Sequence, residues 1–186
     1  MTILNSGLAK SAAADAYTID NSLRFDDGAS AYLSRTPGSD GNRKTWTFSC
    51  WLKKAKNPGA MRLISTADDS TFIGFYFDTN DQLRIDSNGS YNYSIAVYRD
   101  PSAWYHLVVS LDTTQSTTTA RRRAWINGEE VTWDNADVPT LNGDTTFNYT
   151  SQAMSVGSRA GSEPFGGYIA ECYFLDGTGV TDASDF

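Results

Sequence analysis

Histidine and cysteine are scarce in this chain of 186 residues, which contains one His and two Cys. A catalytic triad or a multi-histidine metal site would have to rely on His106 alone, so we interpret His106 as a hydrogen-bonding residue on a sheet face. A secreted disulfide scaffold of this length typically carries more cysteines. We therefore expect synthesis in a reducing cytoplasm. Cys50 and Cys172 are interpreted as core-facing apolar residues, with a disulfide between them as the alternative.

Glutamate is also rare, and this bears on glycoside hydrolysis. Retaining glycosidases need two carboxyl groups about 5–5.5 Å apart on either side of the bond that is cleaved. Glu129 and Glu130 are adjacent in a turn and point apart, Glu163 lies in a Gly/Ser loop, and Glu171 stands alone on its expected strand. The sequence therefore predicts a protein that is not an enzyme.

Basic residues are outnumbered by acidic ones, 15 Lys and Arg against 22 Asp and Glu, which gives a net charge of −7. This balance disfavours nucleic acid as the main partner, because phosphate binding needs clustered Lys and Arg. It disfavours an anionic membrane surface for the same reason. The one basic run, 121–123, is expected on a solvated sheet face, with an anion site or a partner contact as the alternative.

Long apolar runs are missing as well. No stretch approaches the roughly 20 apolar residues of a spanning helix, so membrane insertion is not expected. The first residues, Met1–Asn5, have neither a basic region nor an apolar region, and we expect no signal peptide.

The chain consists instead of short segments in which apolar and polar residues alternate. In 46–53 the alternation predicts one face of Trp46, Phe48, Cys50 and Leu52 and an opposite face of Thr47, Ser49, Trp51 and Lys53. Aromatic residues make up 13% of the chain, and 15 Gly supply turns. Roughly a dozen such segments recur at a spacing of about ten residues. The pattern favours an all-β fold, a sandwich of two antiparallel sheets with jelly-roll topology.

One pair of these segments is especially informative. The run 104–112 (WYHLVVSLD) leads through a polar Thr/Ser loop to 124–128 (AWING). Two alternating strands closed by an Asn-Gly turn are typical of an antiparallel hairpin.

Four blocks of the chain resemble laminin-G-like domains of the concanavalin A-like lectin/glucanase fold. They are residues 22–25, 46–53, 104–112 with 124–128, and 167–177. The resemblance covers about residues 22–177 and implies a two-sheet jelly roll that binds ligands. It places the domain at 18–186 and leaves 1–17 as an N-terminal arm, which is either a frayed terminus or a docking segment.

Two stretches resemble in sequence the laminin-G-like domains of tailed bacteriophages, particularly marine ones. They are 25–37 (FDDGASAYLSRTP) and 98–115 (YRDPSAWYHLVVSLDTTQ). That resemblance implies a virion protein, made in the bacterial host cytoplasm and displayed as a fibre, spike or head decoration. It would adhere to host-surface glycans. The alternative is a decoration or connector subunit that binds other virion proteins. The oligomeric state stays open, a trimer being common among fibres and spikes.

Ligand contacts are expected from aromatic residues on the outward faces of the strands. Trp51 and Trp125 alternate outward, Arg123 lies on the same side as Trp125, and Tyr98 is a further candidate. Such rings either stack on sugars or are covered by loops or a neighbouring subunit. Lectin-like sandwiches also hold Ca²⁺ with loop oxygens. The candidate ligands, which are equally ordinary turn residues, are Asp26, Asp27, Asp68, Asp69, Asp78 and Asp81.

Overall fold

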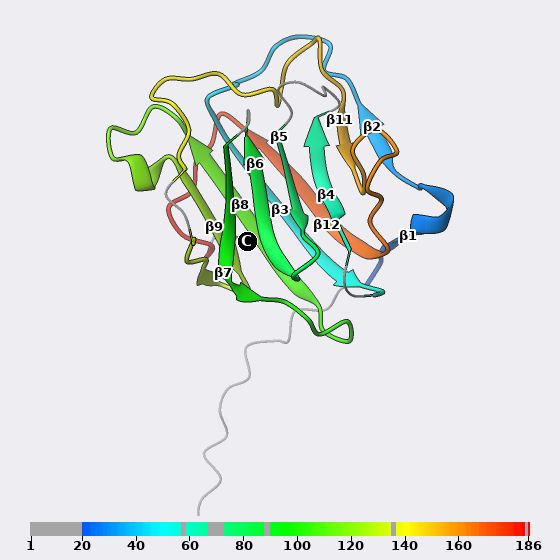
Figure 1. Ribbon diagram of the computed structural model, residues 1–186. Coiled ribbons are helices and arrows are strands. Elements are labelled where there is room, and N and C mark those ends of the chain that lie inside the picture. The colour runs from blue at the N-terminus through cyan, green and yellow to red at the C-terminus, as the bar shows by residue number, and fades with distance from the viewer. Residues whose placement is uncertain (1–19, 57–58, 67–72, 88–89, 135–136, 185) are drawn as a thin grey trace, which may run out of the picture.

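The computed structural model describes residues 20–56, 59–66, 73–87, 90–134, 137–184 and 186. These residues contain twelve strands in two six-stranded antiparallel sheets that pack face to face (Figure 1). The all-β two-sheet prediction is confirmed. The expected arm 1–17 and the Ca²⁺ candidates Asp68 and Asp69 lie outside the described residues. No helix in the described part of the chain has the length and apolar character needed to cross a membrane.

Sheet A contains, in spatial order, β1 (Leu23–Phe25), β12 (Gly167–Asp176), β3 (Thr45–Lys54), β8 (Tyr105–Asp112), β9 (Arg122–Ile126) and β10 (Glu129–Glu130). Sheet B contains β2 (Leu33–Arg35), β11 (Met154–Val156), β4 (Met61–Thr66), β5 (Ile73–Phe77), β6 (Gln82–Ser87) and β7 (Ser90–Val97). Two short 3₁₀ helices, η1 (Asp27–Ala29) and η2 (Thr118–Ala120), lie in connections.

The core lies between the sheets and follows the alternation of the central strands. All four predicted inward residues of β3 are fully buried. Trp46 packs its indole against Phe75 of sheet B and against Phe147, with ring centroids 5.8 and 4.8 Å apart. Burying a large apolar side chain contributes about 1.5–3 kcal/mol, so this row of β3 anchors one sheet to the other.

A buried ion pair joins the two sheets at the end of β3. The Lys54 side chain is completely buried, and its Nζ lies 2.9 Å from Oδ1 of Asp81 in the β5–β6 turn. The ammonium also lies 4.8 Å from the centre of the Phe77 ring. The Asp81 carbonyl accepts a 2.8 Å hydrogen bond from the backbone N–H of Tyr98. The pair is desolvated, so the Lys54 ammonium depends on Asp81 for compensation. The Asp81 carboxylate also has Nε of Arg99 at 3.7 Å.

The outer edge of β7 is covered by the segment that follows β10. The backbone N–H of Ile95 donates to the Thr132 carbonyl, and that of Asp134 donates to the Tyr93 carbonyl, both at 2.9 Å. Ser94 and Trp133 form an antiparallel bridge between these bonds. The chain that leaves sheet A therefore pairs with the last strand of sheet B.

A bulge in β12 corrects the prediction for Cys172. The pairing of β12 with β3 shifts between Ala170 and Tyr173, which leaves Glu171 and Cys172 as an irregularity opposite Cys50. Cys50 is buried, as predicted, but Cys172 is exposed and both thiols are free. The prediction that Cys172 is a core residue is therefore wrong, and the residue lies where the pairing with β3 is irregular.

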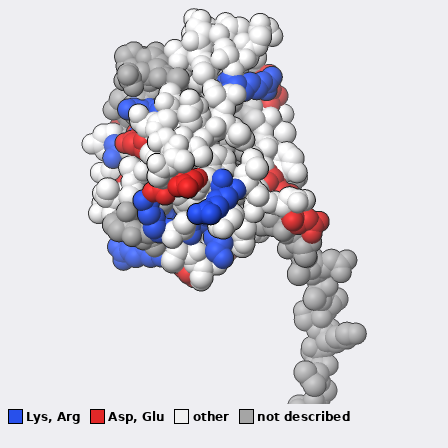
Figure 2. Space-filling view, turned by 90° about the vertical axis from the view of Figure 1, so that its right-hand side faces the viewer, with Lys and Arg blue, Asp and Glu red and all other residues white. Residues whose placement is uncertain are grey.

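The basic run does not form a solvated face, so that expectation was wrong. Arg121 and Arg122 are both buried, and only Arg123 is partly exposed. On the face of the molecule shown in Figure 2, acidic and basic side chains are interspersed and most of the surface is uncharged.

Replacing Asp81 by Asn should leave the Lys54 ammonium buried without a compensating charge. We expect the free energy of unfolding, measured by urea denaturation, to fall by about 3–5 kcal/mol. Asn suits the backbone of this position, where φ is 63°, so the loss reports the charge. The double variant Lys54→Met/Asp81→Asn should recover most of the stability. A loss below about 1 kcal/mol for Asp81→Asn would contradict the role assigned to the pair.

Candidate functional site

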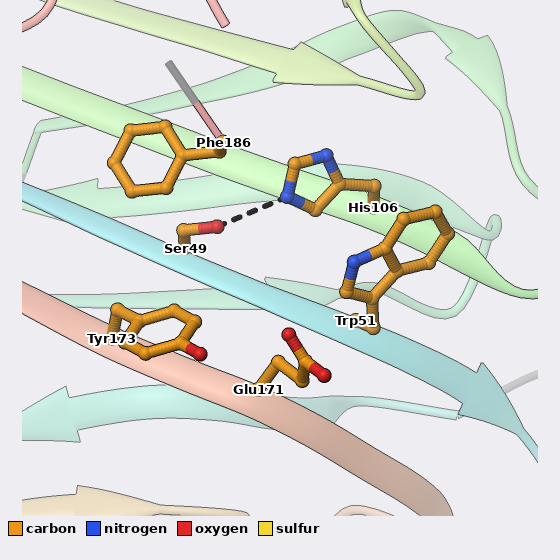
Figure 3. A pocket seen from close by; sticks show the side chains of 6 residues that line it. All are labelled: Ser49, Trp51, His106, Glu171, Tyr173 and Phe186. Atoms are coloured by element: carbon orange, nitrogen blue, oxygen red, sulfur yellow. Dashed lines mark hydrogen bonds between the residues drawn. The ribbon is translucent and has the colours of Figure 1, made fainter. Parts of the chain in front are cut away.

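A hollow of about 170 Å³ lies on the outer face of sheet A. Its walls come from the three adjacent central strands β3, β8 and β12 and from the last residue of the chain (Figure 3). The lining residues combine aromatic and polar side chains: Ser49, Trp51, His106, Glu171, Tyr173 and Phe186.

Strand register brings Trp51 and His106 together. The two residues are direct cross-strand partners of β3 and β8, and both alternate away from the core. Their rings stack with centroids 4.7 Å apart and planes 17° from parallel. Ser49 precedes Trp51 by two positions on the same face, and its Oγ lies 3.0 Å from Nε2 of His106 (Figure 3).

The predicted Asn-Gly turn is present and holds His106 in place. Asn127 and Gly128 both have positive φ, 53° and 83°, as a two-residue hairpin turn between β9 and β10 requires. The Asn127 side-chain oxygen accepts a 2.8 Å hydrogen bond from the His106 backbone N–H. The Asn127 backbone N–H in turn donates to the His106 carbonyl at 2.8 Å. The hairpin is therefore tied to the strand that carries the imidazole.

Burial lowers the pKa of His106 below its ordinary value of 6.5. The imidazole is therefore neutral at neutral pH, with one ring nitrogen able to donate and the other able to accept a hydrogen bond. Glu171 is consequently the one acidic or basic side chain among the residues that line the hollow, apart from the neutral His106.

The β12 bulge supplies the other side of the hollow. Glu171 has a φ of 48°, and the register shift beside it places Tyr173 next to Ser49. The Tyr173 side chain is 52% exposed. Figure 3 shows the Glu171 carboxylate and the Tyr173 ring reaching into the same space below Ser49. The site therefore offers an open aromatic face beside hydroxyl and carboxylate oxygens.

The structure does not bring the four predicted ligand-contact residues together. Trp51 lines the hollow. Trp125 lies on the outer face as expected but is only 3% exposed, because it packs with Val108 against Ala183 of the C-terminal segment. Arg123 lies beside it and donates from Nη1 to the Thr181 carbonyl at 3.0 Å.

Tyr98 lies elsewhere, at the end of the sandwich. Its ring packs edge-on against Phe77 and Tyr105, with both centroid distances 5.9 Å. Burial raises its pKa above the ordinary value. Tyr98 therefore does not lie with Trp51 and Trp125, because the chain turns toward Asp81 directly after β7, and its role in ligand contact stays a prediction.

The Ca²⁺ candidates within the described residues have other partners. Asp26 caps η1 by accepting from the Gly28 N–H, and Asp78 accepts from the N–H groups of the turn that follows it. Asp27 contacts Lys56, and Asp81 pairs with Lys54. Within the part of the chain that the structure describes, no three His, Cys, Asp or Glu side chains are grouped to hold a metal ion. These carboxylates therefore act as turn and ion-pair residues here.

The side chains of the hollow can be compared with the groups that hydrolases use. Glu171 is the single acidic side chain among its lining residues, whereas retaining glycosidases use a pair of carboxyl groups. Ser49 and His106 resemble a nucleophile and its base. However, they sit on strands that are hydrogen-bonded on both sides, so the backbone N–H groups around them are engaged in the sheet. Such groups cannot serve as oxyanion donors.

The sequence reasoning missed Glu171, Tyr173 and Phe186 as members of the site. Alternation counted from Gly167 puts Tyr173 on the core side together with Ile169, and the bulge reverses this. The one available signal of a bulge was the length of the strand, ten residues, with Glu171 and Tyr173 on either side of Cys172. Phe186 comes from the segment after the last strand, which strand patterns do not place.

A family comparison agrees with this architecture. Residues 27–178 match the family described as the concanavalin A-like lectin/glucanases superfamily. The match spans most of the chain, and the protein belongs to this family. No curated protein matches the sequence.

Solved structures share the fold at low sequence identity. Laminin α1 domains LG4-5 from mouse superpose with a TM-score of 0.56 at 12% identity, covering 84% of this chain and 41% of that one. The sialidase domain CBM40 of Ruminococcus gnavus, bound to α2,3 sialyllactose, gives 0.55 at 13% identity over 77% and 91%. Domain 4 of the arabinanase AbnA from Geobacillus stearothermophilus, in complex with arabinotriose, gives 0.51 at 21% identity over 76% and 66%. At these identities the likeness concerns the fold.

Trp125 should behave as a structural residue. Replacing it by Ala removes a buried indole between Val108 and the C-terminal segment. We expect the free energy of unfolding to fall by about 3–5 kcal/mol, measured by urea denaturation. An unchanged midpoint would show that the segment does not cover Trp125 in solution.

His106 should make stability depend on pH. Because its pKa is lower in the folded than in the unfolded state, the unfolded chain binds more protons once the pH falls below about 6.5. The contribution is fully present above that pH and is lost as the pH falls toward the folded pKa. Thermal unfolding from pH about 7 to about 5 should therefore lower Tm more for the native protein than for His106→Gln. Equal slopes would show that His106 is as solvated in the folded chain as in the unfolded one.

Proposed function

We propose that this protein is a non-catalytic carbohydrate-binding protein and that the hollow on the outer face of sheet A binds the sugar. The observation that carries the proposal is the combination of an open Tyr173 ring and the partly exposed Trp51 with the oxygens of Ser49 and Glu171. The apolar face of a sugar ring packs on aromatic rings, while its hydroxyl groups need hydrogen-bond partners. Binding pockets combine aromatic walls with a few placed polar groups in this way.

Two structural relatives support a carbohydrate ligand, since one is bound to sialyllactose and the other to arabinotriose. In this chain the neutral His106 fills the space behind Trp51 and adds no charge to the hollow. The Glu171 carboxylate disfavours an acidic group at the same point. A sugar unit with free hydroxyl groups is the ligand that these residues suit best.

The biological setting that we propose is a bacteriophage virion. Residues 25–37 and 98–115 resemble laminin-G-like domains of tailed bacteriophages. In this setting the protein is made in the bacterial host cytoplasm and displayed on the particle. There its hollow attaches the virion to a host-surface glycan.

A structural decoration or connector role is the second candidate, favoured by apolar side chains on the two edge strands β1 and β2. Leu23 is 56% and Leu33 51% exposed, and both line a second cavity beside Cys172. Such a surface suits contact with another virion protein or with further copies of the chain, for example in a trimer. In that role the edge, and not the hollow, makes the essential contact.

The test of carbohydrate binding is the variant Tyr173→Ala. It should weaken binding to purified capsular polysaccharide or lipopolysaccharide of candidate hosts by about tenfold, because it removes the stacking ring. Stability should change by less than about 0.5 kcal/mol, since the side chain is exposed. Binding is measured by isothermal titration calorimetry on the full chain.

The matched control is Tyr32→Ala, which removes an aromatic residue of similar exposure outside the hollow. It should leave binding unchanged. Equal losses for both variants, or no saturable binding to any of these polysaccharides, would overturn the proposal. In the latter case Leu23→Asp and Leu33→Asp, tested for loss of particle incorporation, would examine the structural role.

A further inference from the structure

A larger cleft, of about 550 Å³, opens where the β9–β10 end of sheet A meets strand β7 of sheet B. It shares no lining residue with the outer-face hollow. Its walls come from η2, β10 and the segment that pairs with β7. Among its lining residues are Thr118, Thr119, Arg122, Glu130, Trp133 and Asp134.

The guanidinium groups of Arg121 and Arg122 have contrasting environments. Arg121 directs three nitrogens to backbone carbonyls, those of Gln115, Pro139 and Ser116, at 2.8, 3.0 and 3.2 Å. Arg122 donates from Nη2 to the Asp137 carbonyl. Its Nη1 is buried and has no hydrogen-bond partner among the described residues. The Arg121 guanidinium thus donates hydrogen bonds from three of its nitrogens, whereas Nη1 of Arg122 is left without an acceptor.

Keeping Arg122 in this place is costly for the fold. The residue is 5% exposed, and burial lowers its pKa to about 10. Within the described residues no carboxylate lies within ion-pair distance of it. A buried donor left without an acceptor destabilises the folded state, and so does a buried charge that only a more distant carboxylate, here that of Asp137, compensates. Because Arg122 lines the cleft, an oxygen of a bound molecule can supply the missing acceptor.

The other cleft residues define what that molecule is. Trp133 is half-buried and offers an apolar ring, while Thr118 and Thr119 are exposed and can both donate and accept. The acidic residues Glu130, Asp134 and Asp137 outnumber the single guanidinium. Carboxylates accept hydrogen bonds from hydroxyl groups and repel anions. The lining therefore fits a neutral polyhydroxylated ring and disfavours an acidic sugar.

We propose that this cleft is a second carbohydrate-binding site, selective for neutral sugars, in which the Arg122 guanidinium donates to a ring or hydroxyl oxygen and Trp133 stacks on the ring. The proposal stands on residues that the outer-face hollow does not use. It makes the protein divalent toward a glycan chain.

The test uses the full chain labelled with ¹⁵N and titrated with D-mannose, D-galactose, L-arabinose and D-glucuronate at millimolar concentration. At least one neutral sugar should shift the resonances of the Trp133 indole N–H and the Arg122 Nε–H. D-Glucuronate should shift them less. The Trp51 indole N–H reports the outer-face hollow separately, so failure at one site is distinguished from failure at the other.

Arg122→Met should weaken the neutral sugar's effect on Trp133 by about tenfold or more, the loss expected for one charged hydrogen bond. Its Tm should equal or exceed that of the native protein, because an unsatisfied buried cation is removed. Asp134→Asn, at an exposed position, should weaken binding without affecting folding. Arg84→Met, a matched substitution on the outer face of sheet B, should change neither signal.

Three results would overturn the proposal: no shift of the Trp133 or Arg122 signals with any neutral sugar, a larger shift with D-glucuronate, or undiminished binding by both Arg122→Met and Asp134→Asn. If Arg122→Met fails to fold, Asp134→Asn alone decides.

Discussion

The central position of β3 is the constraint on which the rest of the structure depends. The strand is hydrogen-bonded to β12 on one side and β8 on the other, so its side chains can point only inward or outward. Trp46, Phe48, Cys50 and Leu52 are thereby committed to the core. Ser49 and Trp51 are committed to the outer face, where they meet His106. The same alternating pattern of β3 therefore places one set of side chains in the core and the other set in the candidate site. A register slip of one residue would move each set to the opposite face of the sheet.

Both proposed sites depend on places where the regular pairing of strands is interrupted. The β12 bulge directs Tyr173 to the outer face, and the irregular segment after β10 surrounds Arg122. Regular strands pair their own backbone N–H and C=O groups with their neighbours in the sheet. Concave, chemically mixed surfaces therefore arise where the ladder is interrupted. The buried Lys54–Asp81 pair has the opposite role, because it fixes the positions of the sheets at the far end of β3.

The alternation of β3 and β8 and the Asn127-Gly128 turn were sufficient to predict the strands, the inward row and the outward placement of Trp51 and Trp125. The pattern of a single strand could not predict the β12 bulge, which depends on how β12 meets β3, and so Tyr173 was not assigned to the outer face. Arg121 and Arg122 read as solvated residues because the carbonyls that bury them come from distant parts of the chain, such as Asp137 and Pro139. The covering of Trp125 by Ala183 is likewise a tertiary contact that no local pattern encodes.

The pairing of residues 132–134 with the free side of β7 has a consequence for how copies of this protein coexist. An open edge strand is a template for the edge of another molecule, and association of this kind leads to aggregation. In β7 two of the outward backbone bonds are already made within the same chain, to Thr132 and from Asp134. At these two positions β7 therefore has no free backbone groups to offer to the edge strand of a neighbouring molecule.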